Sequence, residues 1–171
     1  MATIFRNKDI AFKEDAITIE HFRLFTATPR LSETVDSKNL KFDIRLLHPG
    51  EFSFPYHFHR HAEELIMILT GSMTLRTETG FEIMNAGDLV FFEMGKASAH
   101  QFQNHTSEDC TYLDIRTFLN VDVCEYPDTG KVNIIPPLEI FYKNTAVDYY
   151  EGEENILNKW TELKKEWTRG M

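Results

Sequence analysis

Three histidines and two glutamates lie close together in the segment YHFHRHAEE at 56–64. On a β-strand, side chains two residues apart point to the same face, so His57 and His59 would present two imidazoles side by side. Neutral imidazole is a good ligand for Zn, Fe, Mn, Ni and Cu, and a nearby carboxylate would complete a mixed nitrogen and oxygen site. The segment therefore predicts a site for a transition metal.

Alternation alone does not choose the carboxylate of this site. On one straight strand, Glu63 and His61 would share the face of the first two histidines. However, a strand over 57–69 would be unusually long, and residues 60–63 are better interpreted as a turn between two strands. Because a turn resets the alternation, Glu63 and Glu64 both stay open as ligands.

Size and composition indicate one folded domain with an acidic surface. The chain has 171 residues, of which 42% are apolar, and this is enough to bury a core. The net charge of −9 disfavours nucleic-acid binding, because an acidic surface repels phosphate backbones. No apolar run is long enough for a signal peptide or a membrane span, so we expect a cytoplasmic protein in which Cys110 and Cys124 are free thiols.

Most of the first 120 residues are expected to form short strands. Seven segments rich in β-branched and aromatic residues are separated by turn signals, without helical periodicity between them. This regular spacing predicts an all-β antiparallel sandwich or barrel. The segments are 17–25, 41–47, 64–71, 72–79, 88–92, 99–104 and 111–119.

The last third of the chain has a different character. Prolines and glycines punctuate residues 126–137, which we expect to form an extended arm along the barrel, and 138–143 could add one more strand. Residues 153–167 are predicted to be helical, with one apolar face that packs on the domain's own surface in preference to an oligomer contact. That face consists of Ile156, Trp160, Leu163 and Trp167.

Two spaced motifs are similar to those of the cupin superfamily, whose members are small double-stranded β-helix barrels. In the first family motif, three or four residues separate His-x-His from a glutamate, and six residues separate that glutamate from a glycine. The chain has HFH at 57–59, followed by Glu64 and Gly71 at those distances. The opening glycine of the motif, Gly50, stands one place early.

The second motif follows in the expected order, with two departures. Gly87, Gly95, His100 and Asn104 take the positions of its glycines, histidine and asparagine. Glu93 stands where the family usually has proline, and the gap between the second glycine and the histidine is two residues longer. The resemblance covers about residues 40–118, and its departures concern the loop at the mouth of the barrel.

The resemblance implies a jelly-roll barrel that binds one divalent transition metal per chain: Fe, Mn, Ni, Co or Zn. It selects Glu64 over Glu63 and leaves His61 outside the site, and we expect His61 and His105 to be solvated. A triad made of His61, Glu63 and His100 is the less favoured arrangement. The metal ligands implied by the resemblance are His57, His59, Glu64 and His100.

The same resemblance implies a class of function. An open metal site in a barrel suggests an enzyme that acts on a small oxygen-rich molecule, and we expect a dioxygenase-like oxidoreductase in preference to a sugar-isomerase-like enzyme. The alternative is a non-catalytic cupin that binds or senses a small ligand. We expect a single domain over 1–171, with N-terminal strands in 1–39, an arm and helix in 120–171, and assembly into a homodimer.

Charged residues alternate with apolar ones on two of the expected strands. Asp43 and Arg45 alternate on one strand, and Asp114 and Arg116 alternate on another. Antiparallel sheets commonly expose one face to water, so we expect these four side chains to be solvated. The alternative is that they contact a substrate inside the barrel.

Overall fold

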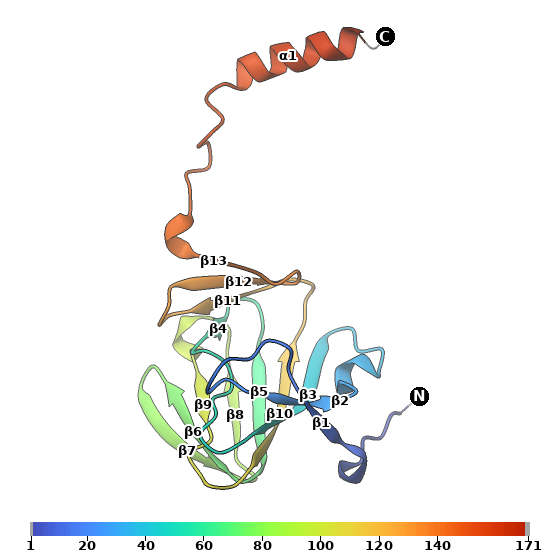
Figure 1. The fold of residues 1–171 in the computed structure, drawn as a ribbon, viewed down its shortest axis with the longest axis vertical. Coiled ribbons are helices and arrows are strands. Elements are labelled where there is room, and N and C mark those ends of the chain that lie inside the picture. Colours follow the sequence, from blue (N-terminus) through green and yellow to red (C-terminus); the bar gives the residue numbers. More distant parts are fainter. Residues whose placement is uncertain (1, 170–171) are drawn as a thin grey trace. The chain divides into compact units, whose positions relative to one another are not determined.

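A computed structural model describes residues 2–169 (Figure 1). The described residues fall into two compact units, divided between Phe141 and Tyr142. The first unit consists of antiparallel β-strands in three sheets, with short 3₁₀ turns at Asn7–Asp9, Leu31–Glu33 and Lys96–Ser98. The second unit contains a 3₁₀ turn at Lys143–Thr145 and helix α1 (Ile156–Arg169). The expectation of a β fold with one C-terminal helix is confirmed.

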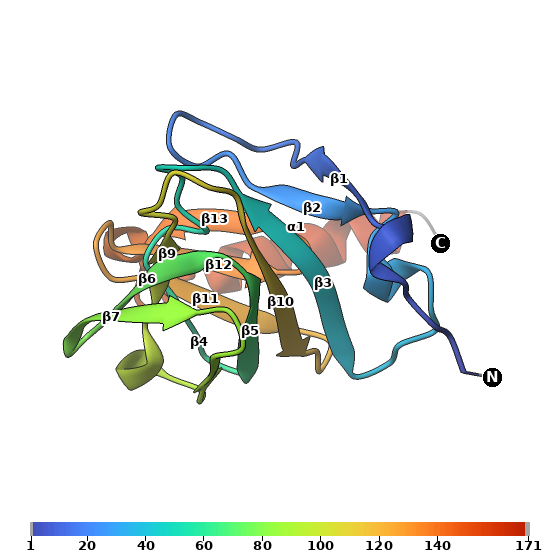
Figure 2. The ribbon, with the colours of Figure 1, turned by 90° about the horizontal axis from the view of Figure 1, so that it is seen from below.

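The largest sheet has six strands, and its central strands lie side by side in Figure 2. β10 pairs with β3 and β5 on its two sides, so residues far apart in the sequence share one face. In order across the sheet, the strands are β1 (Ala11–Glu14), β2 (Phe25–Thr28), β3 (Leu40–Leu47), β10 (Cys110–Thr117), β5 (Glu64–Thr70) and β8 (Leu89–Phe92).

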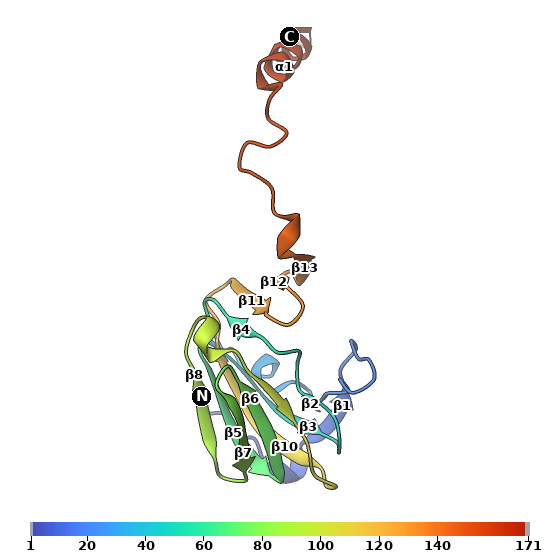
Figure 3. The same ribbon diagram turned by 90° about the vertical axis from the view of Figure 1, so that its left-hand side faces the viewer.

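Two smaller sheets complete the first unit. The three-stranded sheet consists of β7 (Gly80–Asn85), β6 (Ser72–Thr77) and β9 (Gln101–Gln103). The four-stranded sheet consists of β13 (Glu139–Tyr142), β12 (Lys131–Ile135), β11 (Asp122–Tyr126) and β4 (Phe58–His59). Figure 3 shows β11, β12 and β4 at one end of the barrel that the other strands form.

The core fills the space between the six-stranded and three-stranded sheets. Side chains from both sheets contribute, as the alternation of each strand requires. The largest fully buried apolar side chains are Leu47, Ile68, Met73, Phe102 and Tyr112. This apolar core holds in place the strands that carry the site.

The strands predicted inside the barrel are confirmed, but the first predicted strand is wrong. β3, β5, β6, β8, β9 and β10 lie at the expected segments. Residues 17–25 instead form most of the loop between β1 and β2, with Ile17 and Ile19 largely exposed. The left-handed conformation of His21, with a φ of 68°, interrupts any extended run there.

The expected arm is a β-hairpin rather than a single extended segment. β11 and β12 pair with each other, and the turn between them ends at Gly130, whose φ of 65° suits glycine. β11 also pairs with β4, so the hairpin joins the strand that carries the first histidines of the site. The strand expected near 138–143 is β13, and the helix expected at 153–167 is α1, shifted by a few residues. Among residues 2–169, no helix has the length and apolar character needed to cross a membrane.

Candidate metal centre

The four histidine and glutamate side chains suggested by the motifs come together at one end of the barrel. Backbone hydrogen bonds between His57 and His100, of 3.2 and 2.8 Å, hold these two residues opposite each other. His59 closes β4 and Glu64 opens β5, with the short connection 60–63 between them. The connection bears out the predicted turn, and it brings Glu64 rather than Glu63 to the inner face.

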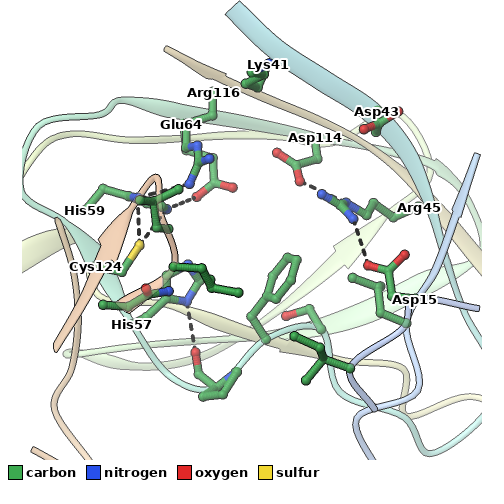
Figure 4. A pocket seen from close by; sticks show the side chains of 18 of the residues that line it. Asp15, Lys41, Asp43, Arg45, His57, His59, Glu64, Asp114, Arg116 and Cys124 are labelled. Atoms are coloured by element: carbon green, nitrogen blue, oxygen red, sulfur yellow. Dashed lines mark hydrogen bonds and ion pairs between the residues drawn. The ribbon is translucent and has the colours of Figure 1, made fainter. Parts of the chain in front are cut away.

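The nitrogen and oxygen atoms of this cluster face one another. Glu64 Oε2 lies 3.1 Å from His100 Nε2 and 3.5 Å from His59 Nε2. Ligand atoms of His57, His59 and Glu64 all lie within 4.8 Å of one another. The four side chains are buried, and three of them line a cavity of about 980 Å³ (Figure 4).

Hydrogen bonds orient the rings so that their Nε2 atoms face the cluster. His57 Nδ1 donates to the carbonyl oxygen of Pro55 at 2.9 Å, and His100 Nδ1 donates to that of Ser98 at 2.9 Å. Because a carbonyl oxygen can only accept, each Nδ1 must carry the hydrogen, which leaves Nε2 with a free lone pair. This is the tautomer that a metal-binding histidine uses.

His59 is oriented differently, by a side chain from the hairpin. Its Nδ1 donates a short hydrogen bond to the carboxylate of Asp122 on β11, and Cys124 Sγ lies 3.1 Å from the same nitrogen. His59, Asp122 and Cys124 form a second group with metal-binding atoms within 4.8 Å. The two groups share His59, and since Nδ1 is occupied by Asp122, its Nε2 is the nitrogen available to the first group.

The residues of the first group fit a divalent metal. Glu64 Oε2 is buried without a regular hydrogen bond to any described residue, although nearby histidines hold the pKa of Glu64 well below its usual range against the effect of burial. Burial lowers the pKa of His57 to about 3, so its ring is neutral, as ligation requires. Burial opposes a charge on His59, but Asp122, Cys124 and Glu64 raise its pKa to about 11. The buried carboxylates of Glu64 and Asp122 therefore favour a positive charge between them, and a bound cation can supply it.

The part of the chain that matches a protein family coincides with the barrel. Residues 44–116 match the family model described as a cupin domain. The chain carries a cupin domain. A search of curated proteins found no match.

Solved structures share the fold of this cupin. A sugar phosphate isomerase from a cupin superfamily, from Silicibacter pomeroyi, has a TM-score of 0.73 and 19% identity over 87% of this chain and 98% of that chain. A protein from Acidithiobacillus ferrooxidans, to which sugar phosphate isomerase activity is attributed, has a TM-score of 0.65 and 25% identity over 72% and 80%. The polyketide cyclase RemF from Streptomyces resistomycificus has a TM-score of 0.54 and 18% identity over 68% and 80%.

The loop before His100 explains the longer gap in the second motif of this cupin. Gly95 has a φ of 100°, and its N–H donates to the carbonyl of His59 at 2.8 Å. The added residues form the 3₁₀ turn Lys96–Ser98, which ends with the carbonyl that orients His100. The loop is thus altered without removing the histidine from the cluster.

The other histidines and glutamate of the segment stay outside the cluster. His61 and His105 are exposed, as expected, and Glu63 is half-buried. The backbone N–H of His61 donates to Asp122 at 3.1 Å, which helps to hold that carboxylate toward His59. Sequence reasoning missed Asp122 and Cys124, although their alternation after the barrel was a signal that a further strand could supply both side chains to one face.

The prediction that the charged strand residues are solvated was wrong. Asp43 and Asp114 are buried, and the Arg45 side chain is only 11% exposed. Arg45 Nε donates to Asp114 at 3.0 Å, and its Nη1 lies 3.5 Å from Asp15. Figure 4 shows this chain of ion pairs across the cavity from His57, His59 and Cys124. The closed barrel turns the polar face of the sheet inward, so the face that carries charge is the lumen.

Proposed function

We propose that this cupin is a metal-dependent enzyme that isomerises a small polyhydroxylated molecule by proton transfer. One observation carries the proposal: the His and Glu cluster shares a 980 Å³ cavity with the Asp114–Arg45 ion pair. A cavity of this size suits a small molecule, and its charged walls suit a substrate rich in hydroxyl groups. The proposal replaces the expectation of a dioxygenase, which nothing in the comparisons favours.

His57, His59, Glu64 and His100 would hold the metal. When bound, a divalent ion would polarise a carbonyl or hydroxyl oxygen of the substrate. The donor set suits Mn, Fe, Co, Ni or Zn. The Nδ1 hydrogen bonds keep the rings in place before any ligand arrives, so the site is preorganised.

Asp114 is the side chain best suited to move a proton. It lines the same cavity as Glu64, and Arg45 Nε holds its carboxylate at 3.0 Å. Burial raises the pKa of Asp114 to about 6, even though Arg45 opposes the shift. A carboxyl group with a pKa near the working pH can both accept and return a proton.

Two buried polar atoms near the cluster add hydrogen-bonding capacity for a substrate. Asn133 Oδ1 and the Tyr112 hydroxyl make no hydrogen bond to any other described residue. Asn133 lines the large cavity, and Tyr112 lines a small adjoining one together with Asp114. Buried polar groups seldom remain unpaired, so substrate hydroxyls are natural partners.

The comparisons support the same class of reaction. The Acidithiobacillus ferrooxidans protein, at 25% identity and a TM-score of 0.65, carries an attribution as a sugar phosphate isomerase. Because one fold can carry unrelated chemistries, this likeness is support only together with the geometry of the site.

Proton exchange at carbon tests the proposal directly. Metal-reconstituted protein would be incubated in D₂O with aldoses, ketoses and their phosphates. NMR would follow loss of the proton signal at the carbon next to the carbonyl, which is C2 of an aldose and C1 of a ketose. Oxygen uptake with catechols and β-diketones would be measured in parallel. We expect exchange with at least one sugar class, none in the His57→Ala/His59→Ala variant, and no oxygen uptake. Oxygen uptake would overturn the proposal, and so would tight ligand binding without exchange, which would indicate a non-catalytic binding protein.

A further inference from the structure

Two cationic side chains stand directly opposite each other on the wall of the cavity. Lys41 on β3 and Arg116 on β10 are register partners, and both line the cavity. The next partner of Arg116 across the sheet is Glu64. Like charges directly opposite on a sheet repel, so this pair is unfavourable unless something negative compensates it.

The other arginines of the cavity are already neutralised. Arg45 is held by Asp114 at 3.0 Å and by Asp15 at 3.5 Å. Arg30 lies 3.3 Å from Asp15 and 3.5 Å from Asp43. These two guanidinium groups stabilise the wall of the cavity, and few of their N–H donors remain for a ligand.

Lys41 has no such partner, and Arg116 has a single, more distant one. Among the described residues, Lys41 has no carboxylate within 4.0 Å, and its Nζ lies 5.0 Å from the centre of the Phe118 ring. Arg116 has one carboxylate in that range, Asp122 at 3.8 Å, which is beyond hydrogen-bonding distance and already accepts from His59. The Arg116 side chain is 20% exposed and lines the cavity, so a ligand there can reach it.

We infer that Lys41 and Arg116 form a binding subsite for an anionic group of the substrate, a phosphate or a carboxylate. The inference deepens the proposed function and rests on it, because the anionic group belongs to the molecule that the metal cluster would bind. Arg116 offers several planar donors and Lys41 a compact charge, a combination that suits phosphate and carboxylate oxygens. Arg116 Nη1 lies 3.5 Å from His59 Nδ1, so the anion would sit beside the cluster rather than at the Arg45 end of the cavity.

The test measures anion binding to the metal-free protein, in which no metal can hold the anion. Inorganic phosphate and acetate would be titrated into metal-free wild type by calorimetry. The variants are Lys41→Gln, Arg116→Gln and, as control, Lys38→Gln, whose lysine is exposed and pairs with Asp36 outside the cavity. We expect binding to wild type and to the control, with a loss of about tenfold or more in affinity for each cavity variant. A preference for phosphate over acetate would identify the anionic group as a phosphate, and the reverse preference as a carboxylate.

The two variants differ in whether the substitution can also disturb the metal cluster. Arg116 contacts His59 and Asp122, so its variant must first show wild-type circular dichroism and metal uptake, whereas Lys41 touches neither residue of that pair. Failure of both anions to bind wild type, or equal binding by wild type and Lys41→Gln, would overturn the inference. Anion binding without any proton exchange would refute the proposed function and leave the subsite standing. Proton exchange by a wild type that binds neither anion would keep the proposed function and refute the subsite.

Discussion

Asp122 accepts a hydrogen bond from Nδ1 of His59, although 63 positions separate the two residues in the sequence. His59 lies within the matched cupin region, whereas Asp122 opens the first strand of the hairpin that follows it. Both side chains are buried. The orientation of one candidate ligand is thus set by a residue outside the barrel.

Replacement of Asp122 by asparagine should weaken metal binding by about 10- to 100-fold. Asparagine keeps the shape of the side chain but removes the charge that makes the imidazole of His59 a stronger ligand. Competition with a coloured chelator measures the affinity. Asp128→Asn is the control, because Asp128 pairs with Arg76 at the surface. Equal affinities for the wild type and the Asp122 variant would show that the contact does not tune the site.

Purified wild-type protein should contain about one divalent transition metal per chain. Removing both His57 and His59 as alanines should abolish this, since two of four donors are lost. Elemental analysis decides the outcome, with His61→Ala/His105→Ala as a control that removes two exposed histidines. A wild type that stays free of metal after reconstitution would mean that the cluster serves structure or ligand binding.

Asp114 should stabilise the metal-free protein less as the pH rises toward neutrality. Burial raises the pKa of Asp114 from 3.8 to about 6, so the folded protein holds this proton more tightly than the unfolded chain. The resulting stabilisation is fully present below pH 3.8 and is lost as the pH rises through about 6. Urea unfolding at about pH 5 and about pH 8 measures it in wild type and Asp114→Asn, which cannot titrate. The advantage of wild type over the variant should shrink at the higher pH, and a constant difference would contradict the assignment.

We also propose that the protein is a homodimer, and light scattering at micromolar concentration tests this. Helix α1 carries an apolar stripe, and Trp160 and Trp167 are its largest members. If the stripe forms the contact, Trp160→Ala/Trp167→Ala should lower the measured mass, whereas Glu162→Ala should not. A monomeric wild type would refute the dimer, and a dimer that survives loss of both tryptophans would place the contact elsewhere.

The barrel and its cluster could be predicted from the sequence because both depend on short-range spacing. His57 and His59 share a strand face by alternation, and the turn at 60–63 explains why the motif spacing brings Glu64 inward. Turn residues between the segments marked most barrel strands, because their backbone requirements are local.

The remaining features depend on which distant strands meet. Asp122 reaches His59 only because β11 pairs with β4, and no local pattern specifies that pairing. The alternation of charged and apolar residues on β3 and β10 correctly predicted two strands, but the charged face was wrongly predicted to be exposed. Alternation separates the two faces of a strand without saying which one the barrel encloses. The loop around His21 was mistaken for a strand because aromatic and β-branched residues favour strands only when a sheet is there to receive them.

The position of the hairpin after the barrel has a consequence for synthesis. A ribosome adds His57, His59, Glu64 and His100 to the chain before it reaches Asp122. Until β11 has been added and has paired with β4, no carboxylate of Asp122 can accept the hydrogen bond from His59 Nδ1. If the cluster binds a metal, these last strands must therefore be translated and docked before His59 is fully oriented toward it.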